Sequence, residues 1–295
     1  MSTTAQVLKA RHWSELGEPT TLVYHKLTKE THPDTNTDPK AVEAFQHLMV
    51  LWKERNTKPK LDVILSTRNG FEFQRTNSGE FLYTVSSKSD NDLLIRAENG
   101  YRLLEATSNP LFFPALAGKR HSPDGRAALQ LDLPDGNWWL LSDFPTLGGR
   151  DIVWIAKRVL VALIIASEKT NMIHGDVNAA NVLVNPAEHG VLLSGWGGQV
   201  KRGEKLIIKP YHTEALLDKK VGSGWLDRRA TATMFEGFNL KEPALVKYFK
   251  YIKDTHVTTR EALRLLEVAA QEAFGAPKFN KLEEPKSPQN LRKRF

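Results

Sequence analysis

The chain has 295 residues, of which 41% are hydrophobic and 25% are charged, and its formal charge is +7 at pH 7 with histidine neutral. This length predicts two compact domains, and the composition excludes a disordered or fibrous chain. The absence of cysteine excludes disulfides and thiolate metal sites, which favours a cytoplasmic location. Basic residues are scattered except for Arg292, Lys293 and Arg294, so we expect no nucleic-acid partner.

No segment is typical of a membrane span or a secretion signal. The longest apolar run, residues 159–166, is far shorter than the roughly 18 residues that a spanning helix needs. Residues 1–6 lack a basic region followed by an apolar one. We therefore expect neither a membrane partner nor a signal peptide.

Two amphipathic helices are predicted within residues 1–56. Asp38 reads as an N-cap followed by Pro39 at the first helical position, which predicts a helix over residues 39–55. An earlier helix lies between Pro19 and Pro33, because proline disfavours helix in the residue before it. Their short connection predicts antiparallel packing with an exposed tip. The apolar positions are Val23, Tyr24, Leu27 and Thr31 in the first helix and Ala41, Phe45, Leu48, Met49 and Trp52 in the second.

The connection contains His32, Pro33 and Asp34, and its flanks place Tyr24 eight positions before the histidine and Phe45 thirteen after it. This arrangement resembles the J-domain family, in which a tyrosine and a phenylalanine lie at those positions around a His-Pro-Asp motif. The resemblance implies a co-chaperone that stimulates a DnaK-type chaperone, with the tripeptide touching the nucleotide-binding domain of that chaperone. A simple turn is the structural alternative.

The flanking helices carry further features of the family. The resemblance implies that Lys26 and Lys29 meet an acidic surface of the chaperone, and solvated lysines are the alternative. The family's first helix and Leu-Gly pair are matched loosely by Trp13, Leu16 and Gly17, which lie closer to Tyr24 than the pattern requires. A non-catalytic scaffold with a vestigial J-domain is therefore a further possibility.

A polar linker at residues 57–60 separates this segment from a stretch rich in β-strand signals. Asn69-Gly70 is a strong hairpin signal between two of the predicted strands. A strand pair around residues 134–137 and a long apolar helix follow. We expect strands at 61–67, 71–75, 80–86, 130–133 and 138–141, and helices at 92–104 and 151–170.

The segment at residues 172–184 places Asp176 five positions before Asn181 and lies between the long helix and a predicted hairpin of 182–184 with 191–193. It resembles the catalytic loop of protein-kinase-like enzymes. The resemblance implies that Asp176 orients or deprotonates an acceptor hydroxyl and that Asn181 holds magnesium on the phosphates. A small β-rich lobe at 61–144 and a larger helical lobe at 145–276 would follow, with residues 210–214 a loose match to the end of an activation loop. Asp227 opens a further predicted helix that runs to residue 235.

Three parts of the phosphoryl-transfer machinery are missing. The magnesium-binding aspartate should precede Trp196-Gly197, where the sequence has Ser194 and Gly195. Asn69-Gly70 leaves no room for a glycine-rich phosphate loop, and the expected lysine falls near Tyr83 or Thr84. Each loss costs orders of magnitude in rate, so we expect a pseudokinase without a cofactor. The nearest substitute residues are Lys88, Arg96 and Glu98.

The alternative is an atypical protein kinase of the serine/threonine type that uses ATP and magnesium, with Asp176 as base. Otherwise Asp176, Asn181 and His174 are structural residues of the loop. No cluster of His, Asp or Glu has metal-ligand spacing, so no metal is expected. Tryptophan is more often a core residue than a stacking surface, and we expect that for Trp138, Trp139, Trp154 and Trp196.

Two more helices, at residues 243–254 and 258–273, complete the predicted helical lobe, with Thr258 or Thr259 as an N-cap and Gly275 near the end. Residues 277–295 form a basic tail. The sequence thus predicts an α+β protein in which a helical J-domain hairpin precedes a two-lobed kinase-like fold. Its expected partners are a DnaK-type chaperone and a protein client that binds the kinase-like domain.

Overall fold

The computed structural model divides the chain into two compact units, Met1–Lys60 and Leu61–Phe295. The linker at 57–60, Asn69-Gly70, Lys88 and residues 210–214 lie outside the described residues. The structure describes residues 2–10, 13–17, 20–54, 61–68, 71–76, 80–85, 91–109, 111–122, 125–207, 221–278 and 282–285, with the side chains of 14, 53, 54, 61–68, 76 and 91 excepted.

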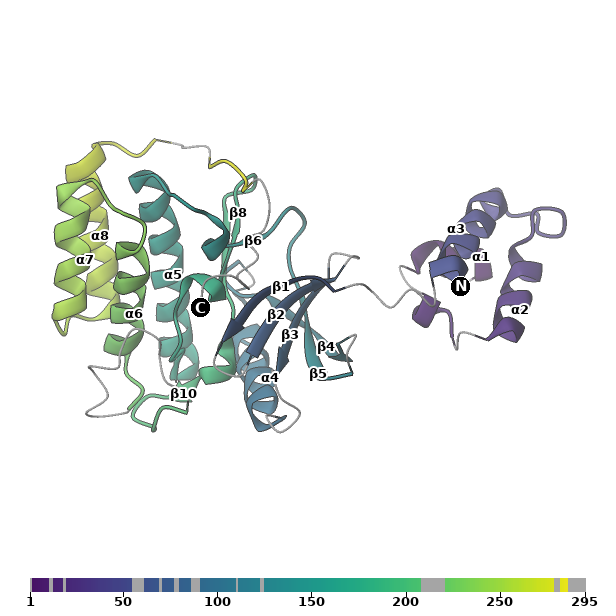
Figure 1. The fold of residues 1–295 in the computed structure, drawn as a ribbon, viewed down its shortest axis with the longest axis horizontal. Coiled ribbons are helices and arrows are strands. Elements are labelled where there is room, and N and C mark those ends of the chain that lie inside the picture. The colour runs from purple at the N-terminus through teal and green to yellow at the C-terminus, as the bar shows by residue number, and fades with distance from the viewer. Residues whose placement is uncertain are drawn as a thin grey trace. The chain divides into compact units, whose positions relative to one another are not determined.

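The first unit is helical (Figure 1). The two predicted helices are present, and the second begins two residues late because the Asp38 carboxylate accepts a hydrogen bond from the Lys40 amide in a turn. A helix that the sequence pattern did not predict lies at the N-terminus, where the Ser2 hydroxyl caps it by accepting from Ala5 N. The elements are α1 (Thr3–Lys9), η1 (Trp13–Glu15), α2 (Thr21–Thr31) and α3 (Ala41–Glu54).

Its core consists of apolar side chains from all four elements. Three partly exposed or buried aromatic rings join η1, α2 and α3, since Tyr24 stacks on Trp52 at 4.3 Å and Trp13 meets Trp52 edge-on at 4.7 Å. These contacts fix α2 against α3 and so position the turn between them. The buried apolar residues are Val7, Ala10, Trp13, Leu16, Leu27, Ala44, Leu48 and Leu51.

The second unit begins with a five-stranded antiparallel sheet in the order β1-β2-β3-β5-β4. Helix α4 packs against it, and Tyr101 and Leu104 of α4 join the aromatic side chains of β2 and β3 in one core. Residues 61–68, 71–76 and 81–85 form strands close to those predicted. The elements are β1 (Leu61–Arg68), β2 (Phe71–Thr76), β3 (Phe81–Val85), α4 (Asn91–Glu105), β4 (Ala115–His121) and β5 (Ala127–Asp132).

The predicted pairing of strands 130–133 and 138–141 is wrong. Strand β5 pairs with β3 and with β4, a strand that the sequence pattern did not predict, whereas Trp139 and Leu140 pair with Val184 and Leu183. A strand is stabilised by whichever partner the tertiary fold brings beside it, and a turn signal between two segments does not decide that partner.

The rest of the second unit is mainly helical, and Figure 1 shows α5, α6, α7 and α8 side by side. The predicted hairpin of 182–184 with 191–193 is confirmed, as are the helices at 243–254 and 258–273 within one residue. The elements are β6 (Trp139–Leu140), η3 (Leu141–Asp143), α5 (Gly149–Thr170), β7 (Met172–Ile173), η4 (Ala179–Asn181), β8 (Val182–Asn185), β9 (Gly190–Leu193), η5 (Trp196–Gly198), β10 (Val200–Lys201), α6 (Gly224–Glu236), α7 (Pro243–Asp254) and α8 (Thr259–Phe274).

Helix ends in this part follow local chemistry. Thr258, one of the two predicted N-caps, accepts a hydrogen bond from Glu261 N at 3.1 Å, and Gly275 ends α8 with a positive φ of 67°. Leu282, from the segment that follows, is buried against the same core. Among the described helices, none is long and apolar enough to cross a membrane.

We predict that Leu48→Ala loosens the first unit, because Leu48 is fully buried in α3 and its loss costs about 2–5 kcal/mol. Hydrogen–deuterium exchange across residues 21–54 should accelerate in the full-length chain, while exchange in Leu61–Phe295 stays unchanged. The neighbouring Met49 is 49% exposed, so Met49→Ala should change stability by no more than about 0.5 kcal/mol. Equal acceleration in both variants would contradict the packing described for α3.

Candidate functional site

In the first unit, His32, Pro33 and Asp34 form the turn between α2 and α3. His32 caps the C-terminus of α2, and its carbonyl oxygen accepts hydrogen bonds from the backbone amides of Thr35 and Asn36 at 3.1 and 2.9 Å. The Thr35 hydroxyl donates to the Lys29 carbonyl at 3.1 Å. The turn is therefore held by hydrogen bonds from backbone and side-chain groups rather than by burial.

The side chains of this turn are arranged around the imidazole of His32. Its Nδ1 accepts a hydrogen bond from Asp34 N at 3.2 Å and lies 3.7 Å from the Asp34 carboxylate. Its ring meets Phe45 of α3 edge-on at 5.0 Å. Because Pro33 is exposed and the Asp34 side chain is 84% exposed, the turn presents an ordered polar surface to solvent.

Asn36, in the same connection between α2 and α3, also stabilises this surface. Its side-chain amide donates to the Glu30 carbonyl at 2.6 Å and to the Thr4 hydroxyl at 3.0 Å, which ties the turn to both α2 and α1. Lys26 and Lys29 lie three residues apart on α2, and both are exposed. The predicted binding residues of the first unit thus occupy one helix and the turn that follows it.

In the second unit, Asp227 of α6 holds the backbone of the loop that follows β7. Its carboxylate accepts hydrogen bonds from His174 N at 2.7 Å and from Gly175 N at 2.8 Å. Burial raises the pKa of Asp227 to about 7, although these two hydrogen bonds oppose the rise. From the sequence, Asp227 was identified only as the start of a helix.

His174 is fully buried and uses both ring nitrogens. Nδ1 accepts from Asp176 N at 3.1 Å, so Nε2 carries the proton and donates to the Ser194 carbonyl at 2.7 Å. The ring also meets Trp196 edge-on at 4.5 Å. Burial lowers the pKa of His174 to about 4, and a second proton would break the bond to Asp176 N.

The structure brings together Asp176 and Asn181, the two predicted loop residues. The Asn181 amide donates to the Asp176 carbonyl at 2.8 Å and contacts its carboxylate at 3.3 Å. Asn178 donates to the same carbonyl at 2.8 Å and caps η4 by accepting from Ala180 N. Asparagine side chains therefore stabilise the loop through the backbone of Asp176.

Gly195 and Gly197 occupy positions that leave no space for a side chain. Gly195 has a φ of 80°, its amide donates to the Tyr101 hydroxyl at 3.1 Å, and a Cβ built there would overlap the Asn181 side chain. A Cβ on Gly197 would overlap the ring of Phe71. An aspartate in place of Gly195 would have to displace Asn181, the other residue that the kinase resemblance assigns to magnesium.

The side of the loop nearest the sheet is occupied by an aromatic cluster, defined as Phe71, Tyr83, Tyr101, Phe113 and Trp196. Phe71 stacks on Tyr83 at 4.6 Å, Tyr83 meets Tyr101 at 6.4 Å, and Phe113 meets Trp196 at 5.7 Å. Burial is the main cause that raises the pKa of the Tyr83 hydroxyl, followed by Tyr101 and the charge of Asp176. Tyr83, one of the two positions near which the lysine was expected, thus holds a neutral ring beside Asp176.

Of the two substitute cations, only Arg96 lies among the described residues, and no ion pair joins it to Asp176 there. Arg96 is exposed, and its carbonyl accepts from Gln199 Nε2 at 3.4 Å. Glu98 pairs with Lys119 of β4 at 2.7 Å and with Arg102 at 3.0 Å. The hydrogen bond from Lys119 is the main cause that lowers the pKa of Glu98. Sequence spacing predicts that Glu98 lies on a helix. It does not predict the ion pair of Glu98 with Lys119 of β4.

The four tryptophans for which a core position was predicted contribute to the core of this unit. Trp138 and Trp196 are buried, whereas Trp139 and Trp154 are partly buried and pack against the same cluster. In the part of the chain that the structure describes, no group of three or more His, Cys, Asp or Glu side chains could hold a metal ion.

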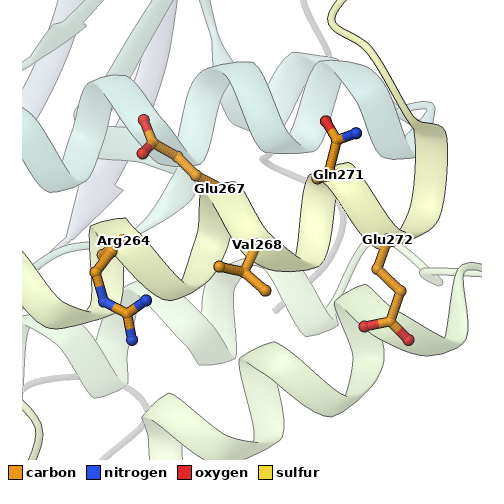
Figure 2. A pocket seen from close by; sticks show the side chains of 5 residues that line it. All are labelled: Arg264, Glu267, Val268, Gln271 and Glu272. Carbon is orange, nitrogen blue, oxygen red and sulfur yellow. The ribbon is translucent and has the colours of Figure 1, made fainter.

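Two surface hollows lie on the helical part of the second unit, and neither is lined by the loop of Asp176. Figure 2 shows the first, where side chains of opposite charge spread from the exposed side of α8 around Val268. Arg264 there already forms an ion pair with Glu261 at 2.6 Å. This hollow is shallow and mixed in charge, and the second is described below.

Comparison with known proteins finds similarity to solved structures, of which one is described here. No family model matches the chain, and no curated protein matches it in sequence. A solved structure described as vaccinia related kinase 3 is 18% identical to this chain, with a TM-score of 0.47 over 72% of this chain and 87% of that chain.

We predict that His174 makes the fold sensitive to acid. Its folded pKa of about 4 lies below the ordinary value of about 6.5, so the unfolded chain binds the proton first. The free energy of unfolding should then fall by roughly 3 kcal/mol from this residue as pH drops from 6.5 to 4. Asp227 works in the opposite direction, because its raised pKa gives stability that is lost as pH rises from about 4 to about 7.

The measurement is urea unfolding of the wild-type chain and His174→Gln at several pH values. Glutamine retains a donor and an acceptor but does not titrate, so the stability difference between the two proteins should narrow or reverse as pH falls. His121→Gln, at an exposed histidine of β4, is the matched control and should follow the wild type. Parallel curves for wild type and His174→Gln would show that His174 is not the acid-sensitive group.

Proposed function

We propose that this chain is a J-domain co-chaperone whose second domain is a degenerate kinase-like scaffold that binds a client protein. The observation that carries the proposal is the exposed turn of His32, Pro33 and Asp34, held between two packed helices. His32 is oriented by Asp34 N and by Phe45, so its imidazole needs little ordering when a partner binds.

Residues 1–56 would contact the nucleotide-binding domain of a DnaK-type chaperone through this turn. Lys26 and Lys29 on the preceding helix would meet an acidic surface and increase the association rate. Such a contact stimulates ATP hydrolysis by the chaperone, which traps a client. The client would be delivered by the second domain, since joining both in one chain raises their effective concentration.

Topology supports the kinase-like assignment of the second unit. A five-stranded antiparallel sheet with one helix precedes the long helix α5, which leads into the loop of Asp176 and Asn181 and the β8–β9 hairpin. The short segment Ser194-Gly195-Trp196-Gly197 follows that hairpin. We assign 61–144 to the β-rich lobe and 145–276 to the helical lobe.

The chemistry of the cleft argues against phosphoryl transfer. Binding ATP requires cations and backbone amides around its phosphates. The aromatic cluster instead places apolar rings beside Asp176, and Gly195 has no space for the missing carboxylate. We therefore propose that the domain acts in the cytoplasm without ATP or magnesium as a cofactor.

One observation favours a second candidate, an atypical protein kinase. The Asn181 amide lies 3.3 Å from the Asp176 carboxylate, so the two residues that would serve as metal ligand and base are already adjacent. ATP would then have to displace Phe71 and Tyr83 from the cleft. The loosely matched residues upstream of Tyr24 leave a third candidate, a scaffold whose J-domain no longer acts on a chaperone.

We predict that the full-length chain accelerates single-turnover ATP hydrolysis by a DnaK-type chaperone from the same cell. His32→Gln should reduce the stimulation by roughly tenfold or more, as expected for a hot-spot residue. His121→Gln, on the second unit, should retain it. Absence of stimulation by the wild type would favour the scaffold, and equal stimulation by His32→Gln would remove His32 from the contact.

We also predict that ATP with magnesium leaves the thermal unfolding temperature of the chain unchanged, because buried aromatic rings pack against the loop where phosphate-binding groups would be needed. A ligand that binds only the folded state raises this temperature, so differential scanning fluorimetry with and without magnesium is sufficient. A magnesium-dependent rise that is lost in Asn181→Ala would support the kinase instead.

A further inference from the structure

The second hollow of the second unit is a groove of about 450 Å³ at a junction of four segments. The C-terminal part of α5, the turn after β10 and the N-terminal ends of α6 and α8 all contribute to it. We call it the arginine groove and define it by Glu168, Arg202, Trp225, Arg228, His256 and Arg260.

Its lining carries an excess of positive charge. Three arginines face one glutamate, which leaves two positive charges in excess with His256 neutral. Arg260 binds the Glu168 carboxylate through two nitrogens, both at 2.5 Å, and so neutralises the only acidic residue among those lining it. Arg202 is exposed and donates to the uncharged Ser167 hydroxyl at 2.5 Å.

Arg228 is the most unusual residue of the groove, since it is only 2% exposed. Its Nε and Nη2 donate to the carbonyl oxygens of Ile252 at 3.3 Å and Thr255 at 2.8 Å. Within the described part of the chain, no carboxylate forms an ion pair with it, and burial lowers its pKa to about 10. A buried charge without a counter-ion is costly, and an anion in the groove would reduce that cost.

Two helix N-termini add to the positive electrostatic potential of the groove. Helix α6 has 13 residues and α8 has 16, and their first residues are neighbours, because a Cβ built on Gly224 would lie 3.6 Å from the Thr259 hydroxyl. Each helix N-terminus carries about half a positive charge and backbone amides that lack partners within the helix. Because the N-termini of α6 and α8 both line the groove with Arg228, they stabilise negative charge there.

The side chain of Trp225 also lines the groove. The indole Nε1 of Trp225 is buried and has no hydrogen-bond partner among the described residues. The indole ring stacks on His256 at 4.9 Å, and Arg229 lies 5.3 Å from its centre on α6. Because this nitrogen is buried, Trp225 contributes its ring rather than a hydrogen-bond donor to the wall of the groove.

We propose that the arginine groove binds a phosphate-class oxyanion carried by a phosphorylated segment of a partner protein. A phosphate group has close to two negative charges and three strong acceptor oxygens, which match the charge excess and the several donors. The positive groups line a single groove of about 450 Å³, which favours one phosphate group over an extended nucleic-acid backbone. The proposal concerns the second unit alone and holds whether or not the first unit acts on a chaperone.

The test is isothermal titration calorimetry of the full-length chain with inorganic phosphate, and then with a phosphothreonine peptide and its unphosphorylated form. We expect saturable binding of phosphate and tighter binding of the phosphopeptide. Arg202→Gln should weaken both by roughly tenfold, as for loss of one charge-assisted hydrogen bond. Glu168→Gln should strengthen both, because it removes the acidic residue of the lining.

Arg264→Gln is the matched control, since Arg264 is paired with Glu261 on α8 outside the groove. It should bind phosphate as the wild type does. No saturable heat at millimolar phosphate, or binding that Arg202→Gln leaves unchanged, would overturn the proposal. In a competition experiment, single-stranded RNA and inorganic phosphate are each added to the complex with the phosphopeptide. Displacement by RNA at a lower concentration than by phosphate would indicate that the partner is a nucleic acid rather than a phosphorylated protein.

Discussion

The second unit depends on one buried carboxylate. Asp227 lies on α6, yet its two oxygens accept the backbone amides of His174 and Gly175, which are more than fifty positions away in the chain. Since an unpaired buried amide is costly, these bonds fix the loop wherever α6 lies. His174 then transmits the constraint, because its ring nitrogens bind Asp176 N and the Ser194 carbonyl. The positions of Asp176, Asn181 and Gly195 all follow from this arrangement.

The same arrangement explains how the loop of Asp176 and Asn181 stays folded beside the aromatic cluster. The hydrogen bonds that hold Asp176 and Asn181 in place come from Asn178, Asn181 and the backbone, and none requires a metal or a phosphate. The interior next to the loop is stabilised by Phe71, Tyr83 and their neighbours, which contribute apolar burial instead of charge. The loop therefore needs none of the missing charged groups for its stability, which is consistent with the scaffold role proposed above.

Positive charge has a different distribution in this unit from the one a kinase-like enzyme needs. Lys119 and Arg102 are paired with Glu98 on α4, so these cations are not available near Asp176. At the junction of α5, α6 and α8, by contrast, Arg228 is buried without a carboxylate partner among the described residues. The exposed His32 turn of the first unit and the arginine groove of the second are the two surfaces that we propose for recognition, and each is held by hydrogen bonds to backbone carbonyls.

What the sequence by itself determined is local. The α7 and α8 helices, the Thr258 cap and the β8–β9 hairpin agree with prediction, because side-chain periodicity, capping hydrogen bonds and short turns act within a few residues. Tertiary structure alone decided which distant segments meet. It paired β5 with β4 instead of β6, gave Glu98 a lysine from β4, placed Tyr101 against Gly195 and left Arg228 without a counter-ion among the described residues. Those outcomes depend on how separate elements pack, and no spacing within one segment encodes them.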